Sequence, residues 1–264
     1  MASTTPKVIL VTGANQGLGF AVIQVAAQRY PEATYVLASR NPHSGQEAVN
    51  KLRGLGIRAI IEVVELDVTN DEQIAAAVDF IKTRFGKLDV LINNAGISGP
   101  LRPPESESLS EMRKRYNTVL DTNLTSVAVL ARAFTPLLHA SPGPSPKVIN
   151  VSSGLGSMTN ALTRKMGRAP AYGASKVGLN GLSVHLQIEE NDRVEAGIAL
   201  EKPRIKTFVV APGLLRTAFT KFSVGRDPLE GAEPIVRLAF DEDESFEGGT
   251  FWEWEGGEMR RVPW

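Results

Sequence analysis

The segment Val8–Gly19 reads VILVTGANQGLG and is followed by Phe20–Ala27, an apolar run without glycine. This order predicts a buried strand, a glycine-rich turn and a helix. Backbone N–H groups at such a helix N-terminus can approach a pyrophosphate, and the helix dipole favours the negative charge. The glycines could serve only to make a tight bend, but the strand-turn-helix context favours a dinucleotide site. The residues expected to contact the cofactor are Gly13, Asn15, Gln16, Gly17, Leu18 and Gly19.

Short apolar runs rich in β-branched residues alternate with segments of helical period along the rest of the chain. The alternation predicts an α/β protein with a doubly wound (Rossmann) fold, in which helices flank a parallel sheet. Strands of one kind continue on both sides of every loop, so residues 1–264 are interpreted as a single domain. Seven strands are expected, at Val8–Thr12, Thr34–Ala38, Ala59–Asp67, Asp89–Asn93, Lys147–Ser152, Ile205–Ala211 and Thr250–Trp254.

Two helix starts carry the spacing of a capping box, at Thr69–Glu72 and at Ser108–Glu111. The first precedes an amphipathic run that should stop at Gly86. The alternating aromatic tail from Phe251 is typical of a half-buried edge strand. Loops are expected at Ser98–Ser110, Ser141–Pro146 and Glu189–Pro203.

Composition excludes several classes of partner. Lys and Arg total 29 against 29 for Asp and Glu, so no net charge attracts nucleic acid or an anionic membrane. The lack of cysteine excludes disulfides and thiolate chemistry, and the N-terminus has no apolar run of signal-peptide or membrane-span length. We therefore expect a soluble cytoplasmic protein. No metal site is expected, because His43, His139 and His185 lack metal-ligand spacing.

The end of the second expected strand should select the cofactor. An acidic residue there would bind the ribose hydroxyls of NAD, whereas Arg40 can form charge-assisted hydrogen bonds with the 2′-phosphate of NADP. An arginine at a strand end could also be merely solvated. The interpretation adopted is NADP(H) as the cofactor.

The spacing of Gly13, Gly17 and Gly19 resembles the TGxxxGxG turn of the short-chain dehydrogenase/reductase family, and further motifs of that family recur in order along nearly the whole chain. Many NADP-preferring members also have a basic residue in this turn, where the present chain has Gln16. The resemblance implies further cofactor contacts at Leu66 and Asp67, at Asn94, Ala95 and Gly96 of an NNAG tetrad, and at Pro212, Gly213 and Thr217 of a PGxxxT motif. Alternatively, Asp67 could be a cap residue, and Pro212-Gly213 a simple turn.

Tyr172 and Lys176 have the Y-x-x-x-K spacing of the family's active site. Residues four apart share a helix face, so the ammonium can lie beside the phenol, lower its pKa and make it a proton donor near neutral pH. By the resemblance, Ser153 binds the substrate oxygen, with Ser152 as the alternative. Asn123 would complete a tetrad by kinking its helix and holding a water that relays protons; it could also be a local helix defect. Both Tyr172 and Lys176 would contact the cofactor as well.

Within the family, the chain resembles carbonyl reductases, through its TGANQGLG turn, Val36–Asn41 and the terminal Arg-Val-Pro-Trp, although it lacks a long insertion before the tyrosine. The resemblance implies NADPH-dependent reduction of a ketone or aldehyde on a small organic substrate. The segment Thr159–Pro170, with Arg164, Lys165 and Arg168, should border the substrate entrance. Glu189–Lys202 is interpreted as an insertion after the tyrosine helix. Because that helix usually forms the dimer contact in the family, the resemblance also implies a homo-oligomer (dimer or tetramer).

Three alternatives stay open at this point: alcohol oxidation on the same site, imine reduction, and a non-catalytic NADP-binding sensor or scaffold. A pure binder would have no need of Tyr172, so the Ser153, Tyr172 and Lys176 set favours an enzyme.

Overall fold

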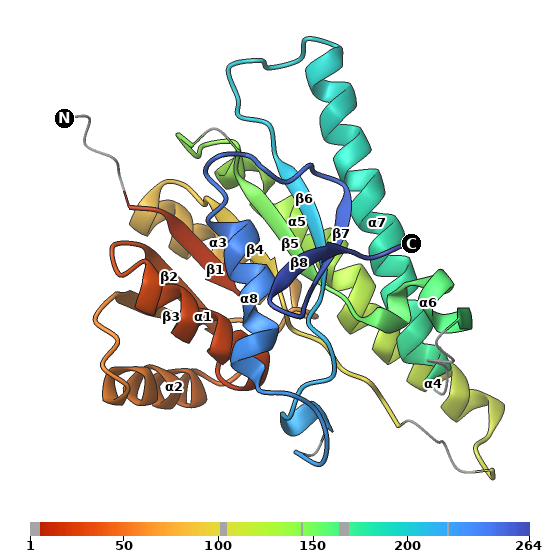
Figure 1. The fold of residues 1–264 in the computed structure, drawn as a ribbon. Coiled ribbons are helices and arrows are strands. Elements are labelled where there is room, and N and C mark those ends of the chain that lie inside the picture. Colours follow the sequence, from red (N-terminus) through yellow and green to blue (C-terminus); the bar gives the residue numbers. More distant parts are fainter. Residues whose placement is uncertain (1–5, 101–104, 144, 164–168, 221) are drawn as a thin grey trace.

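One sheet organises the computed structural model, which describes residues 6–100, 105–143, 145–163, 169–220 and 222–264 (Figure 1). Within these residues the strands lie in the order β3-β2-β1-β4-β5-β6-β7-β8. The first seven are parallel to their neighbours, and β8 is antiparallel to β7. The strands are β1 (Val8–Val11), β2 (Thr34–Ser39), β3 (Ile60–Glu65), β4 (Val90–Asn93), β5 (Lys147–Val151), β6 (Lys206–Ala211), β7 (Thr250–Glu255) and β8 (Glu258–Arg261).

The doubly wound fold with its seven parallel strands is confirmed, but the prediction missed β8. Gly256 and Gly257 have φ angles of 63° and 87°, which suit the two-residue turn of a hairpin. The strand that follows, Glu258–Arg261, has no apolar alternation that would reveal it. It pairs with β7 all the same, so β7 is not the edge strand that was expected.

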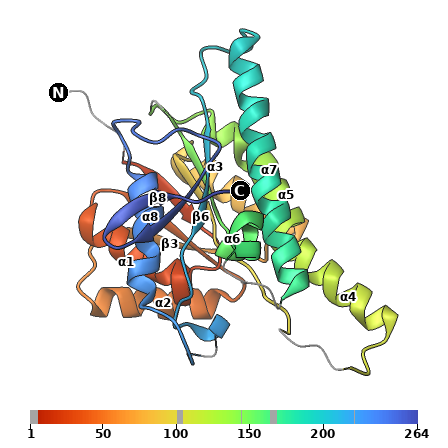
Figure 2. The same cartoon turned by 45° about the vertical axis from the view of Figure 1, so that its right-hand side comes forward.

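Helices cover both faces of the sheet because the parallel strands are apolar on both sides. Ile9 and Val11 of β1 belong to the core under α1 (Gly17–Arg29), α2 (Pro42–Gly54) and α8 (Pro228–Ala239). Val8 and Leu10 belong to the core under α3 (Asp71–Phe85) and α5 (Ser126–Leu138). Figure 2 shows the two layers, with α7 (Pro170–Glu195) beside α5 and with α4 (Leu109–Leu120) and α6 (Met158–Thr163) toward the same side.

Two of the three expected helix boundary signals are confirmed. Ser108 and Glu111 form the capping box, and Gly86 ends α3 in the left-handed conformation, with φ of 72°. The expected box at Thr69 is wrong, because Asn70 caps α3 by accepting a hydrogen bond from the Gln73 N–H at 2.9 Å. Thr69 instead donates its N–H and its hydroxyl to Asp67.

The expected loop Glu189–Pro203 is also partly wrong, because α7 continues to Glu195. Glu190 accepts two hydrogen bonds from Arg193 and one from the Ile205 N–H, which holds the end of the helix against the sheet. Such a contact between residues far apart in sequence has no local signal. None of the helices in the described ranges is both long enough and apolar enough to cross a membrane.

A buried carboxylate links α1 to α8. Glu233 accepts two hydrogen bonds from Arg29, at 3.0 and 2.6 Å, and a third from Arg237 at 2.7 Å. Burial by itself opposes ionisation of Glu233, but the hydrogen bonds from the two arginines hold its pKa below the ordinary value. The ionised carboxylate therefore stabilises the packing of these two helices.

We expect Glu233→Gln to lower the melting temperature at pH 7, because the amide cannot replace the charge between two arginines. Because the pKa of Glu233 is lower in the folded protein than in the unfolded chain, where it is about 4.3, its ionisation stabilises the fold at pH values above about 4.3. This stabilisation is lost as the pH falls through the pKa of the folded state. The difference between variant and wild type should therefore shrink in acid. Melting curves from pH 8 to 3 test this, with exposed Glu189→Gln as the control; a difference that is constant over this range would contradict the assignment.

Candidate active site

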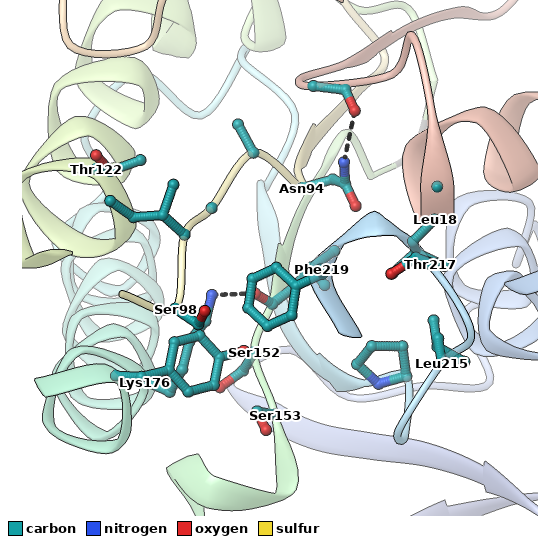
Figure 3. A pocket seen from close by; sticks show the side chains of 18 of the residues that line it. Leu18, Asn94, Ser98, Thr122, Ser152, Ser153, Lys176, Leu215, Thr217 and Phe219 are labelled. Atoms are coloured by element: carbon teal, nitrogen blue, oxygen red, sulfur yellow. Dashed lines mark hydrogen bonds between the residues drawn. The ribbon is translucent and has the colours of Figure 1, made fainter. Parts of the chain in front are cut away.

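A large cleft lies outside the carboxyl ends of the parallel strands, where the strand order reverses between β1 and β4. Open α/β sheets bind ligands at such switch points because loops there diverge to opposite faces. The volume, about 2390 Å³, exceeds the roughly 300–1,000 Å³ of common ligand pockets, so a dinucleotide and a second small molecule fit together. Figure 3 shows side chains from both faces pointing into this space.

The glycine turn forms one wall of the cleft. Gly13 and Gly17 have φ angles of 61° and 58°, which residues with a side chain rarely adopt. A Cβ at Gly19 would lie 2.6 Å from Asn94 Nδ2 and 2.7 Å from the Gly13 carbonyl oxygen, so only glycine lets α1 pack this closely. Asn15, Gln16 and Leu18 also line the cleft. The turn thus leaves a cradle in which backbone can approach a ligand.

Asn94 fastens the end of β4 to the glycine turn. Its side chain donates to the Thr12 carbonyl at 2.8 Å and to the Gly13 carbonyl at 3.2 Å, the second of which is drawn in Figure 3. The Asn94 and Ala95 N–H groups donate to the Thr12 hydroxyl at 2.9 and 3.0 Å. Ala95 and Gly96 follow along the cleft wall. The NNAG tetrad therefore joins the two central strands at the switch point.

Arg40 stands exposed at the outer end of the cleft, beyond β2. Leu66 and Asp67 line the same end. Burial opposes ionisation of Asp67, but hydrogen bonds from Thr69 and the charge of Arg40 hold its pKa below the ordinary value. Asp67 therefore both accepts hydrogen bonds from Thr69 in the turn before α3 and lines the cleft.

Tyr172 and Lys176 lie at the opposite end of the cleft, on the first turns of α7. The Lys176 Nζ donates to the Val151 carbonyl at 2.8 Å and lies 5.7 Å from the centre of the Tyr172 ring. The Ser153 side chain lies close enough to the Tyr172 phenol to lower its pKa, against the effect of burial. Ser152, the alternative, is buried and donates to Asn180 at 2.7 Å. The structure therefore places Ser153 at the tyrosine.

The expectation that Lys176 lowers the pKa of the Tyr172 phenol is wrong for the protein without cofactor. Burial raises the pKa of Tyr172 to about 12, opposed by the nearby Ser153 side chain. Burial likewise lowers the pKa of Lys176 to about 8. Desolvation disfavours the charged form of both groups, and the lysine donates to Val151 rather than to the phenol. Tyr172 is therefore a neutral phenol over the whole physiological range.

Asn123 is fully buried in a π-helical turn, η1 (Asp121–Thr125), so the helix is distorted at this residue as expected. Its Oδ1 accepts from the Ile97 N–H at 2.9 Å, and its Nδ2 donates to the Ile97 carbonyl at 2.8 Å and to Ser175 at 3.0 Å. A Cβ at Gly96 would lie 3.1 Å from Asn123 Oδ1 and 3.8 Å from Lys176 Nζ. Asn123 thus links the backbone after β4 to the helix that carries the lysine.

The PGxxxT motif covers the cleft from the β6 side. Gly213 has φ of 82°, and Thr217 would lie 3.6 Å from a Cβ at Gly17, so the motif closes on the glycine turn. Arg226 holds this segment by donating to the carbonyls of Pro212 at 2.9 Å and Trp254 at 2.8 Å.

Sequence reasoning missed Phe219, whose ring centre is 5.5 Å from that of Tyr172. It lies in the short helix η3 (Ala218–Thr220), is 48% exposed and lines the cleft, where Figure 3 labels it. No periodic pattern marks it, and its only sequence signal is a position two residues after Thr217. Of the segment expected to border the entrance, Thr159–Thr163 belongs to α6 and Asn160 lines the cleft. Arg164, Lys165 and Arg168 lie outside the described residues.

The fold and this cleft define a doubly wound α/β protein with a ligand site at its topological switch point, and comparison with known proteins gives its family. The model of the short chain dehydrogenases matches residues 7–226. A short-chain dehydrogenase/reductase of Aspergillus fumigatus is 55% identical over 265 residues, covering 100% of this chain and 99% of the relative. The chain therefore belongs to the short-chain dehydrogenase/reductase family.

Solved structures agree with this membership. An NADPH-bound carbonyl reductase from chicken fatty liver superposes with a TM-score of 0.75 at 25% identity, covering 98% of this chain and 99% of that one. A metagenomic short-chain oxidoreductase in complex with NADP gives a TM-score of 0.70 at 26% identity, covering 93% and 96%.

We expect Gly19→Ala to lower stability by about 1–3 kcal/mol, the usual cost of overpacking, and to weaken binding of the nicotinamide cofactor. The new Cβ would press on backbone atoms of Gly13 and Ala14, which form the cradle. Gly181→Ala is the matched control, since a Cβ there meets nothing within 4 Å on an exposed helix face, and should stabilise by about 0.5–1 kcal/mol. Melting curves and fluorescence titrations report both effects; equal behaviour of the two variants would refute the packing argument.

Proposed function

We propose that the chain is an NADPH-dependent reductase that converts a ketone or aldehyde carbonyl on a small organic substrate to an alcohol. The observation that carries the proposal is the arrangement of the cleft. Ser153, Tyr172 and Lys176 lie on the β5 side of the cleft, Arg40 lies after β2, and the glycine turn after β1 lies between them. The similar structures that hold NADPH and NADP support NADP(H) as the cofactor.

The residues of the cleft fit the cofactor in kind and in order. The glycine cradle suits a pyrophosphate, Arg40 suits a 2′-phosphate, and the backbone at Ala95 and Gly96 with the Lys176 ammonium suits a ribose. When bound, NADPH supplies a hydride to the carbonyl carbon. The proposed contacts at the two ends are Leu66 and Asp67 for the adenine, and Pro212, Gly213 and Thr217 for the carboxamide.

Ser153 and Tyr172 polarise the substrate oxygen by donating hydrogen bonds to it, and Tyr172 gives it a proton. With its pKa raised to about 12 by burial, the phenol holds that proton at neutral pH. Lys176, whose burial lowers its pKa to about 8, is mainly the ammonium there. It stabilises the phenolate that forms, and Asn123 holds a water that resupplies the proton.

Apolar side chains of the cleft, among them Phe219 next to Tyr172, suit an apolar substrate. Leu155, Leu214, Phe219 and Val224 line the cleft, and three of them are exposed: Leu214 at 61%, Phe219 at 48% and Val224 at 52%. Exposed apolar side chains around a reactive group lose contact with water when an apolar ligand covers them. A panel of ketones, aldehydes and quinones, scored by loss of NADPH absorbance, tests the proposal; no turnover with any carbonyl class would contradict it.

We expect the unmodified protein to bind NADPH more tightly than NADH, because a charge-assisted contact with Arg40 contributes roughly 1.5–3 kcal/mol. Arg40→Asp should reverse the order, since a carboxylate repels the 2′-phosphate and binds ribose hydroxyls. Dissociation constants for both cofactors, measured by fluorescence, decide the point. Arg58→Asp, an equally exposed arginine outside the cleft, is the control and should keep the preference for NADPH. Equal affinity of the wild type for both cofactors would rule out this role of Arg40.

Tyr172→Phe should reduce turnover by roughly 10²–10⁴-fold, as expected for loss of a general acid, while NADPH binding persists. The control is Tyr30→Phe, whose ring stacks on Phe240 away from the cleft.

Lys176→Met should impair turnover and NADPH affinity together, because the Lys176 ammonium both supports proton transfer by Tyr172 and binds the cofactor ribose. Wild-type reduction should decline as pH rises through about 8, where Lys176 loses its proton. Full activity of Tyr172→Phe would refute the mechanism and favour another chemistry.

A further inference from the structure

Asn180 is a buried side chain of α7 for which the proposed mechanism has no use. It is 3% exposed and lies four residues after Lys176 and eight after Tyr172, so all three occupy the same face of the helix. A buried amide costs free energy unless its polar atoms find partners. The partners of this one all lie in the turn that carries Ser153.

The Asn180 side chain bridges the two ends of that turn. Its Oδ1 accepts a hydrogen bond from the Ser152 hydroxyl at 2.7 Å, and its Nδ2 donates to the Gly156 carbonyl at 2.9 Å. Ser152 precedes Ser153 directly, and Gly156 ends the short 3-10 helix η2 (Gly154–Gly156) that follows it. One side chain therefore fixes the residues on both sides of Ser153.

The turn also packs too tightly for another arrangement. A Cβ at Gly156 would lie 2.7 Å from the Ser152 hydroxyl, 2.9 Å from Asn180 Nδ2 and 3.0 Å from the Lys176 carbonyl oxygen. Inside the turn, the Ser153 Oγ accepts from the Leu155 N–H at 3.2 Å, and the Ser153 carbonyl accepts from the Gly156 N–H at 2.8 Å. The turn is thus held against the helix that carries the tyrosine and the lysine.

We propose that Asn180 is a positioning residue that sets the place of the Ser153 hydroxyl relative to Tyr172, by clamping the serine turn to the helix that carries the tyrosine. The proposal rests on the proposed function, because it gives Ser153 a role in turnover. It also explains why the two adjacent serines differ although both line the cleft: the Ser152 hydroxyl donates to the clamp, whereas the Ser153 hydroxyl oxygen accepts from the Leu155 N–H within its own turn.

A double-mutant cycle tests the clamp on the full-length enzyme, with NADPH and the carbonyl that the wild type reduces best. Asn180→Leu, of similar volume, should lower kcat by roughly 10- to 100-fold, since a misplacement of about 1 Å can cost that much. The NADPH dissociation constant should not change. In a Ser153→Ala background, Asn180→Leu should cause little further loss of kcat, because the hydroxyl that Asn180 positions is already absent.

Ser183→Ala is the matched control. Ser183 lies on the same helix and is also buried, and it accepts a hydrogen bond from Asn150 and donates to the Leu179 carbonyl, so its loss disturbs the buried network without touching the serine turn. It should leave kcat near the wild-type value. Should Asn180→Leu fail to fold, Ser152→Ala removes one of the two clamping bonds and should lower kcat in the same direction.

Amide hydrogen exchange supplies a readout that needs no turnover. Exchange in a peptide spanning residues 153–157 should accelerate in Asn180→Leu and stay unchanged in Ser183→Ala. Unchanged exchange there, or an equal loss of kcat in both serine backgrounds, would overturn the clamp. A fully active Ser153→Ala enzyme would instead refute the proposed function, so the two failures are distinguishable.

Discussion

The hydrogen bonds between Thr12 and Asn94 hold together the two strands from which the sheet grows in opposite directions. A cleft exists at this point because the loops after β1 and β4 leave toward different faces. Gly19 lets α1 approach to within contact of the Asn94 side chain, so the pyrophosphate cradle and the end of β4 form one packed unit. Every other wall of the cleft is placed relative to that unit.

Helix α7 makes the second rigid connection. Buried polar groups along one of its faces hold it to the sheet: Lys176 donates to Val151, Asn180 accepts from Ser152, and Ser183 accepts from Asn150 of β5. Because buried polar groups must find partners, the register of this helix on β5 is strongly specified. The reactive phenol is thereby fixed to the strand that leads, two residues after its last residue Val151, to Ser153.

Burial sets the protonation states at this end of the cleft. Desolvation raises the pKa of Tyr172 to about 12 and lowers that of Lys176 to about 8, so both groups are pushed toward their neutral forms. A neutral phenol is the form that can donate a proton. The lysine, which loses its proton at a lower pH than an exposed ammonium would, is poised close to the neutral range in which general acids and bases work best.

The sequence by itself determined the features that depend on neighbouring residues: the seven parallel strands, the glycine turn, the capping box at Ser108 and the stop at Gly86. Ordered motifs along the chain also identified the family. Only the tertiary structure decided which serine faces Tyr172, how far α7 extends, that β8 pairs with β7, and that Phe219 lies at the tyrosine. The pKa of the Tyr172 phenol, which was expected to be lowered, is raised instead. These features arise from burial and from partners far away along the chain, and no local pattern of residues encodes them.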